Sequence, residues 1–191
     1  MLLALQGYDS RFAPMNPGAG DYSHFGSDVT FIGHYERHYS ACLRAANRGG
    51  HKLRIWGPGW PRYALLHPWT KLPVEGNGVW GREYPIALGC SKIALGLLSK
   101  RFPETTTTRT FEIPAIGVFL LAERTEDHLQ LFTEGVEAEY FGSETELRDK
   151  IGFYLRHDEA RQKIARAGRE RCIKSGYDAE SQLRKLLTQI A

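Results

Sequence analysis

The chain has 191 residues, of which 42% are hydrophobic and 25% charged, and its formal net charge at pH 7 is +3. This length predicts one domain with an appendage, and it allows a core that needs no disulfide or metal to be stable. The small net charge gives no reason by itself to expect a nucleic-acid-binding protein.

The cysteines and the longest apolar runs bear on location. Cys42, Cys90 and Cys172 are widely spaced and odd in number, so they predict neither a metal site nor a disulfide framework and suit a reducing cytoplasm. No apolar run approaches the roughly 20 residues of a membrane span. Residues 1–5 are too short an apolar segment for a signal peptide. We therefore expect a cytoplasmic protein without a membrane span.

The first part of the chain predicts a βαβ unit. Residues 1–27 are rich in Gly, Pro, Tyr and Asp without periodicity, and we expect an irregular lead-in. Residues 28–32 and 52–56 read as strands, and the apolar spacing across 39–46 predicts a helix between them, which implies a parallel sheet. Ligands of such sheets bind at the carboxyl ends of strands, where Gly33 and Arg37 follow the first strand. Arg37 is equally a phosphate contact or part of a solvated helix start.

The middle of the chain is expected to be mostly loop before the next strand. Residues 57–61 form a glycine- and proline-rich turn rather than a dinucleotide fingerprint, and residues 62–78 read as loop. Trp80 and Gly81 then follow beside a candidate cleft, where Trp80 would stack on a base or simply pack. Lys92 opens a buried strand over 92–98, either as an edge lysine or as a phosphate ligand.

The most informative stretch is residues 108–121, which predicts a short helix, a glycine stop at Gly117 and a buried strand. Arg109 and Glu112 lie about one turn apart at the start of this helix. A helix start attracts phosphate, an arginine adds paired hydrogen bonds, and a carboxylate accepts ribose hydroxyls. An ion pair that merely supports the helix is the alternative.

After residue 121 we expect one more helix and one more strand, followed by helices to the end of the sequence. The pattern predicts a helix over 127–132, an outer strand over 138–141, and a helix from Ser143 whose capping box includes Glu146. A basic helix over 160–174 is read as a solvated face, and leucines from 183 onward predict a last amphipathic helix.

The segment 109–117 with its following apolar strand, together with 125–137, resembles the spore-maturation (CgeB-type) group of glycosyltransferases. The similarity continues in 92–98 and 165–172. It implies an α/β domain of Rossmann-like, three-layer architecture with a central parallel sheet, the C-terminal half of a GT-B enzyme. The domain would occupy 28–176, with a linker remnant over 1–27 and a C-terminal helix over 177–191.

The resemblance also implies roles for single residues. Glu112 would hold the ribose hydroxyls, and Arg109 with Lys92 would neutralise the diphosphate. The loops at Gly33 and Arg37, and at Trp80 and Gly81, would complete the donor site, the latter pair near the base. Glu104, with seven residues between it and Glu112, would lie near the sugar as the catalytic residue. No metal or cofactor is implied, because protein cations would stabilise the leaving group.

The predicted function is thus a glycosyltransferase-like domain that binds a nucleotide-diphosphate sugar. It would act as an enzyme if a partner domain or a second copy of the chain supplied the acceptor-binding half and covered the cleft. Two alternatives stay open: a non-catalytic nucleotide-binding or interaction module derived from a truncated glycosyltransferase, and a dinucleotide or flavin binder. The missing G-x-G-x-x-G after the first strand counts against the latter. No nucleic-acid partner is expected.

Overall fold

The computed structural model describes residues 5–12 and 15–190, apart from the side chains of the last two. Six strands run through the domain: β1 (Ser27–Ile32), β2 (Leu53–Trp56), β3 (Val74–Gly76), β4 (Ser91–Gly96), β5 (Phe119–Glu123) and β6 (Glu139–Phe141). The helices are α1 (Ala19–Phe25), α2 (Arg37–Ala46), α3 (Trp60–Leu66), α4 (Glu83–Gly89), α5 (Thr108–Ile116), α6 (Glu126–Leu131), α7 (Glu144–Arg156), α8 (Asp158–Lys174) and α9 (Ala179–Ile190). Short 3-10 turns are η1 (Ser10–Phe12), η2 (Asn47–Gly49) and η3 (Pro68–Thr70).

The strands form one parallel sheet in the order β3-β2-β1-β4-β5-β6. From β1 the chain adds β2 and then β3 on one side of the sheet. It then returns to the other side of β1, where it adds β4, β5 and β6 in turn. The loops that leave β1 and β4 therefore diverge, which opens a crevice at the carboxyl ends of these two strands. The predicted three-layer fold with a parallel central sheet is confirmed.

Two apolar clusters cover the two faces of the sheet. On β5, Leu120 and Ala122 point to the cluster that includes α4 and α5, while Phe119 and Leu121 point to the cluster with α2, α3 and α7. This alternation follows from the two-residue period of a strand. Every residue of β5 is buried, as a strand covered on both faces must be.

Helix α5 is held by its two ends. Its N-cap is Thr107, whose N–H donates to Oγ1 of Thr110 at 3.1 Å. Gly117 ends the helix in the left-handed conformation with φ of 96°, as the sequence predicted. These caps fix the first turn of the helix, with Arg109 and Glu112, against the carboxyl edge of the sheet.

Several elements were not predicted from the sequence. Residues 19–25 form α1 within the expected irregular lead-in, and α3 and the edge strand β3 fall within the expected turn and loop. At the start of α7, Ser143 accepts the N–H of Glu146 as expected, but the Glu146 carboxylate accepts the N–H of Gly142 instead of that of the cap residue. These short elements have too little periodicity to stand out in a sequence.

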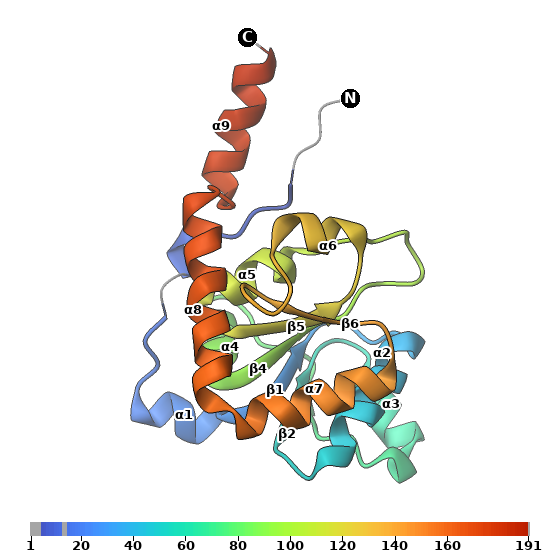
Figure 1. Ribbon diagram of the computed structural model, residues 1–191. Coiled ribbons are helices and arrows are strands. Elements are labelled where there is room, and N and C mark those ends of the chain that lie inside the picture. The colour runs from blue at the N-terminus through green and yellow to red at the C-terminus, as the bar shows by residue number, and fades with distance from the viewer. Residues whose placement is uncertain (1–4, 13–14, 191) are drawn as a thin grey trace.

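The segments leading to the two ends of the chain meet. Tyr8 forms an isolated parallel bridge with Asp178, in which the Tyr8 N–H donates to Tyr177 O and the Ala179 N–H donates to Tyr8 O. From this bridge α9 projects away from the sheet (Figure 1), and Leu183 and Leu187 on it are more than half exposed. Among the described residues, no helix combines the length and the apolar character that a membrane span requires.

Candidate functional site

A pocket of about 340 Å³ opens at the carboxyl edge of the sheet. It lies where β1, β2 and β3 end and α5 begins, the place at which the strand order reverses. Its lining consists of Phe12, Ile32, Gly33, Gly57, Pro58, Gly78, Val79, Trp80, Gly81, Tyr84, Thr108, Arg109 and Glu112.

Arg109 spans the point where the sheet topology switches. Its guanidinium donates to the carbonyl of Ile32 at the end of β1 and to that of Leu97 just after β4, each at 3.3 Å. It also lies over the Phe31 ring, 5.6 Å from the centroid, while its buried Nε has no hydrogen-bond partner among the described residues. Among the described residues Arg109 forms no ion pair with a carboxylate, so its positive charge is available to a ligand.

The pocket floor depends on two glycines in contact. A Cβ added at Gly33 would lie 2.8 Å from Cζ of Phe31 and 3.0 Å from Nη1 of Arg109. A Cβ at Gly57, whose φ is +151°, would collide with the carbonyl of Gly33. That carbonyl accepts the indole N–H of Trp60 at 2.9 Å. The backbone is therefore bare next to the cation, which suits close approach by a ligand.

Glu112 is positioned by a neighbouring helix. Its Oε2 accepts a hydrogen bond of 2.6 Å from the hydroxyl of Tyr84 in α4. Burial, followed by the Glu112 charge, raises the pKa of Tyr84 well above its usual value, so this tyrosine stays a hydrogen-bond donor. Glu112 Oε1 takes part in no hydrogen bond or ion pair with the described residues.

Aromatic rings close the other side of the pocket. Trp80 is 65% exposed, and its ring packs over Gly78, where a Cβ would lie 2.6 Å from Cζ2. Gly81 continues the same loop with a positive φ of 55°. Phe12, from the N-terminal segment, faces Tyr84 edge-on at 6.4 Å between centroids. Trp80, Phe12 and Tyr84 thus give this pocket an aromatic lining.

Two buried carboxylates hold the loops beside the pocket, and sequence reasoning missed both. Glu36, the residue before α2, accepts hydrogen bonds from Ser99 Oγ at 2.6 Å and from the Lys100 N–H. Burial raises the pKa of Glu36, but the hydrogen bonds from Ser99, His34 and Lys100 outweigh it and hold that pKa below its ordinary value. Glu123, at the end of β5, accepts the N–H of Leu98 at 2.8 Å. The sequence signal that could have identified them is an acidic residue just before a predicted helix, for Glu36, or at the end of a predicted strand, for Glu123.

Glu104 and Arg37 lie near the pocket but not in its wall. The Glu104 carboxylate accepts the Ser99 N–H at 2.9 Å, within the loop between β4 and α5. Arg37 is the exposed first residue of α2 and lines a separate hollow with Lys100 and Arg101. The pocket thus gathers Gly33, Trp80, Gly81, Arg109 and Glu112 from the predicted set.

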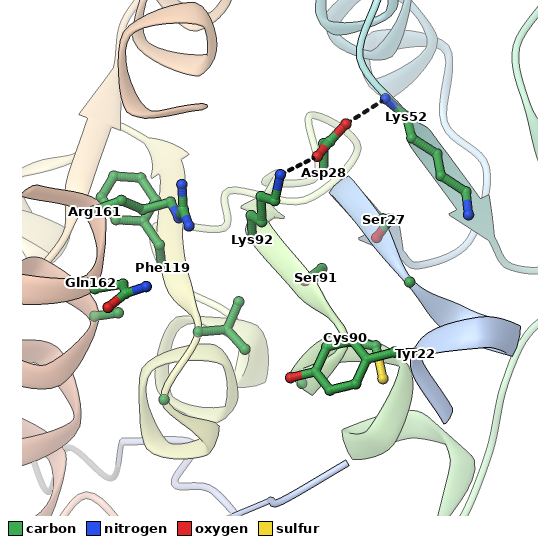
Figure 2. A pocket seen from close by; sticks show the side chains of 15 residues that line it. Tyr22, Ser27, Asp28, Lys52, Cys90, Ser91, Lys92, Phe119, Arg161 and Gln162 are labelled. Atoms are coloured by element: carbon green, nitrogen blue, oxygen red, sulfur yellow. Dashed lines mark hydrogen bonds and ion pairs between the residues drawn. The ribbon is translucent and has the colours of Figure 1, made fainter. Parts of the chain in front are cut away.

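Lys92 lies at the opposite edge of the sheet, which corrects the expectation that it joins Arg109 at a diphosphate. It stands at the amino end of β4 and pairs with Asp28 at 2.7 Å (Figure 2). The pocket there, of about 480 Å³, receives the C-terminal ends of α1, α4 and α5 at Gly26, Cys90 and Gly117. Besides these helix ends, which carry partial negative charge, the lining includes Lys52, Lys92 and Arg161.

The described residues contain no group of three or more His, Cys, Asp or Glu side chains that could hold a metal ion. The three cysteines are free, and burial raises the pKa of Cys42 and Cys172 to about 12 and that of Cys90 to about 11. At neutral pH these thiols are therefore protonated, the less nucleophilic form.

The chemistry of the carboxyl-edge pocket follows from this geometry. The Arg109 guanidinium beside the N-terminus of α5 offers positive charge and N–H donors to phosphate oxygens. Gly33 and Gly57 contribute no free N–H, because theirs donate to the carbonyls of Trp56 and Gly76, but without side chains they let a ligand approach closely. A carboxylate one turn further along offers a free oxygen to a hydroxyl pair, and an exposed indole offers a face for a planar ring. These groups match the parts of a nucleoside diphosphate.

Comparisons with known proteins point the same way. The model of a family described as glycosyl transferase-like matches residues 37–188. No curated protein sequence matches the chain.

Solved structures share the fold at low identity. HepE from Anabaena, in complex with UDP-glucose, has a TM-score of 0.77 at 13% identity, with 99% of this chain and 57% of that one covered. The C-terminal domain of LpcC, a glycosyl transferase group 1 family protein from Francisella tularensis, gives 0.67 at 12% identity, covering 90% and 98%. A sucrose-phosphate synthase from Thermosynechococcus elongatus gives 0.71 at 17% identity, covering 96% and 51%. The chain therefore spans little more than half of the HepE structure.

Proposed function

This chain belongs to the glycosyl transferase-like family, and we propose that it forms the donor-binding site of a CgeB-type enzyme that transfers a sugar from a nucleoside diphosphate. Its fold is that of the C-terminal Rossmann-like domain of GT-B glycosyltransferases. The nucleotide-sugar donor and the residue roles below belong to the proposal.

One observation carries the proposal: Arg109 and Glu112 face the same pocket from one helical turn, at the switch point of the sheet. The structure with the same fold named above binds UDP-glucose, which supports a donor of this class here. A cation and a carboxylate on the first turn of a helix suit the diphosphate and the ribose of one ligand.

We assign each part of the donor to the group that suits it. The diphosphate lies on Arg109, the Gly33 backbone and the start of α5, and the ribose hydroxyls bind the free oxygen of Glu112. The base lies against Trp80 and Gly81. We assign Glu104, whose carboxylate accepts the Ser99 N–H in the loop that precedes α5, to the sugar. The leaving diphosphate is stabilised by these fixed donors, without a metal or cofactor.

The acceptor-binding half comes from outside this domain in the proposal. GT-B donor sites need a facing surface, and this chain spans 57% of the HepE structure that it resembles. A second domain or a second copy of the chain would cover the pocket. The proposal includes a reducing, cytoplasmic compartment, in keeping with the three free thiols.

Calorimetric titration of the chain with UDP, GDP, ADP and CMP tests the proposal. One diphosphate should bind, and Glu112→Ala should weaken it by about 1.5–3 kcal/mol, tenfold or more, because a hydrogen bond to a charged group is lost. The matched control is Asp28→Ala, which removes a carboxylate from the opposite edge and should leave the affinity unchanged.

Two results would count against the proposal. If none of the nucleotides bound to the folded wild-type chain, the isolated domain would not be a donor site. If Asp28→Ala weakened binding and Glu112→Ala did not, the ligand would lie in the pocket of Figure 2 at the opposite edge.

A further inference from the structure

The end of α3 and the turn after it carry an unusual concentration of exposed apolar side chains. Leu65 is 80% exposed, Trp69 72% and Leu66 56%, within five consecutive positions. Scattered exposed leucines are ordinary, but three large apolar side chains on one short protrusion form a surface that water contacts at a cost. We call this surface, with the neighbouring Arg62 and Lys71, the α3 tip.

The α3 tip lies within the most basic part of the chain. Residues 37–74 contain seven Lys and Arg residues and no Asp or Glu. Besides Arg62 and Lys71, Arg44 reaches the tip and donates to the Tyr63 hydroxyl at 3.3 Å. All three cations are exposed, and none forms an ion pair within the part of the chain that the structure describes. The positive charge around the apolar side chains is therefore not neutralised from within the domain.

The α3 tip is a rigid platform. The ring of His67 stacks on that of Tyr63 at 4.3 Å between centroids, and Trp69 stands edge-on to His67 at 5.1 Å. Thr70 Oγ1 donates to the His67 carbonyl at 2.8 Å. Lys71 has a φ of +50°, the one positive φ of a non-glycine residue among those described, and it turns the chain sharply after the tip. The apolar side chains are thus presented by a fixed backbone.

The α3 tip faces away from the donor pocket. Trp60, at the start of α3, bonds the Gly33 carbonyl at the carboxyl edge, whereas the Lys71 carbonyl accepts from Asn47 at the end of α2, near the amino edge. In Figure 1, α3 lies at the bottom of the view and α9 at the top. A partner on the tip would leave the pocket open.

We propose that the α3 tip docks this domain on the surface of an anionic lipid bilayer. Trp and Leu side chains that protrude from a surface insert at the boundary between headgroups and acyl chains, and nearby Lys and Arg bind anionic headgroups. The unpaired cations give the charge complementarity, and the convex apolar side chains need an apolar medium. A nucleic acid would use the cations but would leave Leu65 and Leu66 in water.

Co-sedimentation with vesicles tests the docking. The whole chain should bind vesicles of phosphatidylcholine and phosphatidylglycerol mixed in equal parts, and bind vesicles of phosphatidylcholine alone far more weakly. Arg62→Gln/Lys71→Gln should weaken partitioning roughly tenfold or more, because each surface cation contributes on the order of a fivefold effect. Leu65→Ser/Trp69→Ser should weaken it at least as much. Added salt should release the protein.

A matched control distinguishes this surface from exposed apolar side chains in general. Leu183→Ser/Leu187→Ser changes two α9 residues that are 56% and 58% exposed, and it should leave vesicle binding unchanged. If this variant lost binding while Leu65→Ser/Trp69→Ser kept it, the bilayer would bind α9 and the inference would be wrong.

The remaining outcomes also decide. The inference would be overturned if the wild-type chain failed to bind the anionic vesicles. It would also be overturned if the wild-type chain bound a single-stranded oligonucleotide but no vesicles, and Arg62→Gln/Lys71→Gln abolished that oligonucleotide binding. Thermal unfolding establishes that each variant is folded. Titration with UDP is independent of the tip, so loss of vesicle binding leaves the proposed donor site untouched, and the converse also holds.

Discussion

The Tyr84 hydroxyl donates a hydrogen bond of 2.6 Å to Oε2 of Glu112, across the packing of α4 against α5. The Glu112 carboxylate is the group that we assign to the ribose. One of its oxygens is thus fixed by the protein, and the other is left for the ligand. Tyr84 positions the carboxylate, and this gives it a measurable effect on ribose recognition.

Tyr84→Phe should keep the packing of the ring and release the carboxylate. We expect nucleotide affinity to fall by about 1 kcal/mol, severalfold, because a positioned charge-assisted hydrogen bond is lost. The ratio of affinities for UDP and 2′,3′-dideoxy-UDP should shrink as well. If Tyr84→Phe lowered the affinities for both nucleotides by the same factor, Tyr84 would have a structural effect and no role in ribose recognition.

Gly33→Ala should damage the pocket from its floor. The added Cβ would lie 2.8 Å from Phe31 Cζ and 3.0 Å from Arg109 Nη1, so the ring and the guanidinium must both shift. We expect a loss of about 1–3 kcal/mol in the free energy of unfolding and at least a tenfold loss of diphosphate affinity. Gly76→Ala, which meets nothing within 4 Å, is the control and should change neither by much. Calorimetry and denaturant titration measure the two quantities.

Arg109 and Lys92, the two cations that the family resemblance assigned to the diphosphate, should differ in their effect on nucleotide affinity. Arg109→Gln should lower the affinity for UDP tenfold or more and the affinity for UMP by a smaller factor, because we assign the guanidinium to the diphosphate. Lys92→Gln should leave both affinities unchanged, since its ammonium pairs with Asp28 at the other edge. Equal losses in the two variants would refute the separation of the two edges.

The acid side of the stability profile should depend on Glu146. Its hydrogen bonds with Arg124, the largest contribution, lower the pKa of Glu146 to about 2. A lowered pKa means that the stabilising contribution is fully present above the ordinary value of 4.5 and is lost as pH falls toward 2. Because the side chain is 31% exposed, we expect only about 1 kcal/mol from it.

Glu146→Gln should therefore unfold more easily than the wild-type chain at pH 7 and as easily near pH 2. Chemical denaturation across this range would show the two stabilities converging. Parallel curves would mean that the Glu146 pair with Arg124 contributes no linkage to protonation.

Sequence reasoning reached the parts of this domain that carry a strong local signal. The helix over 108–116 and the buried strand after Gly117 were predicted because a cap, an apolar face and a glycine stop agree with one another. Strand β3 was missed because a three-residue edge strand is specified by its neighbour β2 and not by its own pattern. Helix α3, with proline in its first turn, was predicted as the end of a turn followed by loop.

The site was predictable where its residues share one element. Arg109 and Glu112 lie on one helical turn, so their spacing predicted that they lie close together, while their roles at a donor site were implied by the family resemblance. Lys92 was misplaced because a strand has two ends on opposite sides of the domain, and it lies at the start of β4. Tyr84 and Phe12 enter through tertiary packing that no spacing reveals.

The bridge between Tyr8 and Asp178 joins the start of α9 to the N-terminal segment that reaches the pocket. Phe12, which lines the pocket beside Tyr84, follows Tyr8 by a single turn of η1, and Ala179 begins α9 directly after Asp178. The two hydrogen bonds of Tyr8 therefore connect the start of α9 to the segment that carries Phe12, by a route that does not pass through the sheet. The aromatic side of the pocket is thus anchored by the same pair of backbone hydrogen bonds that holds the first turn of α9.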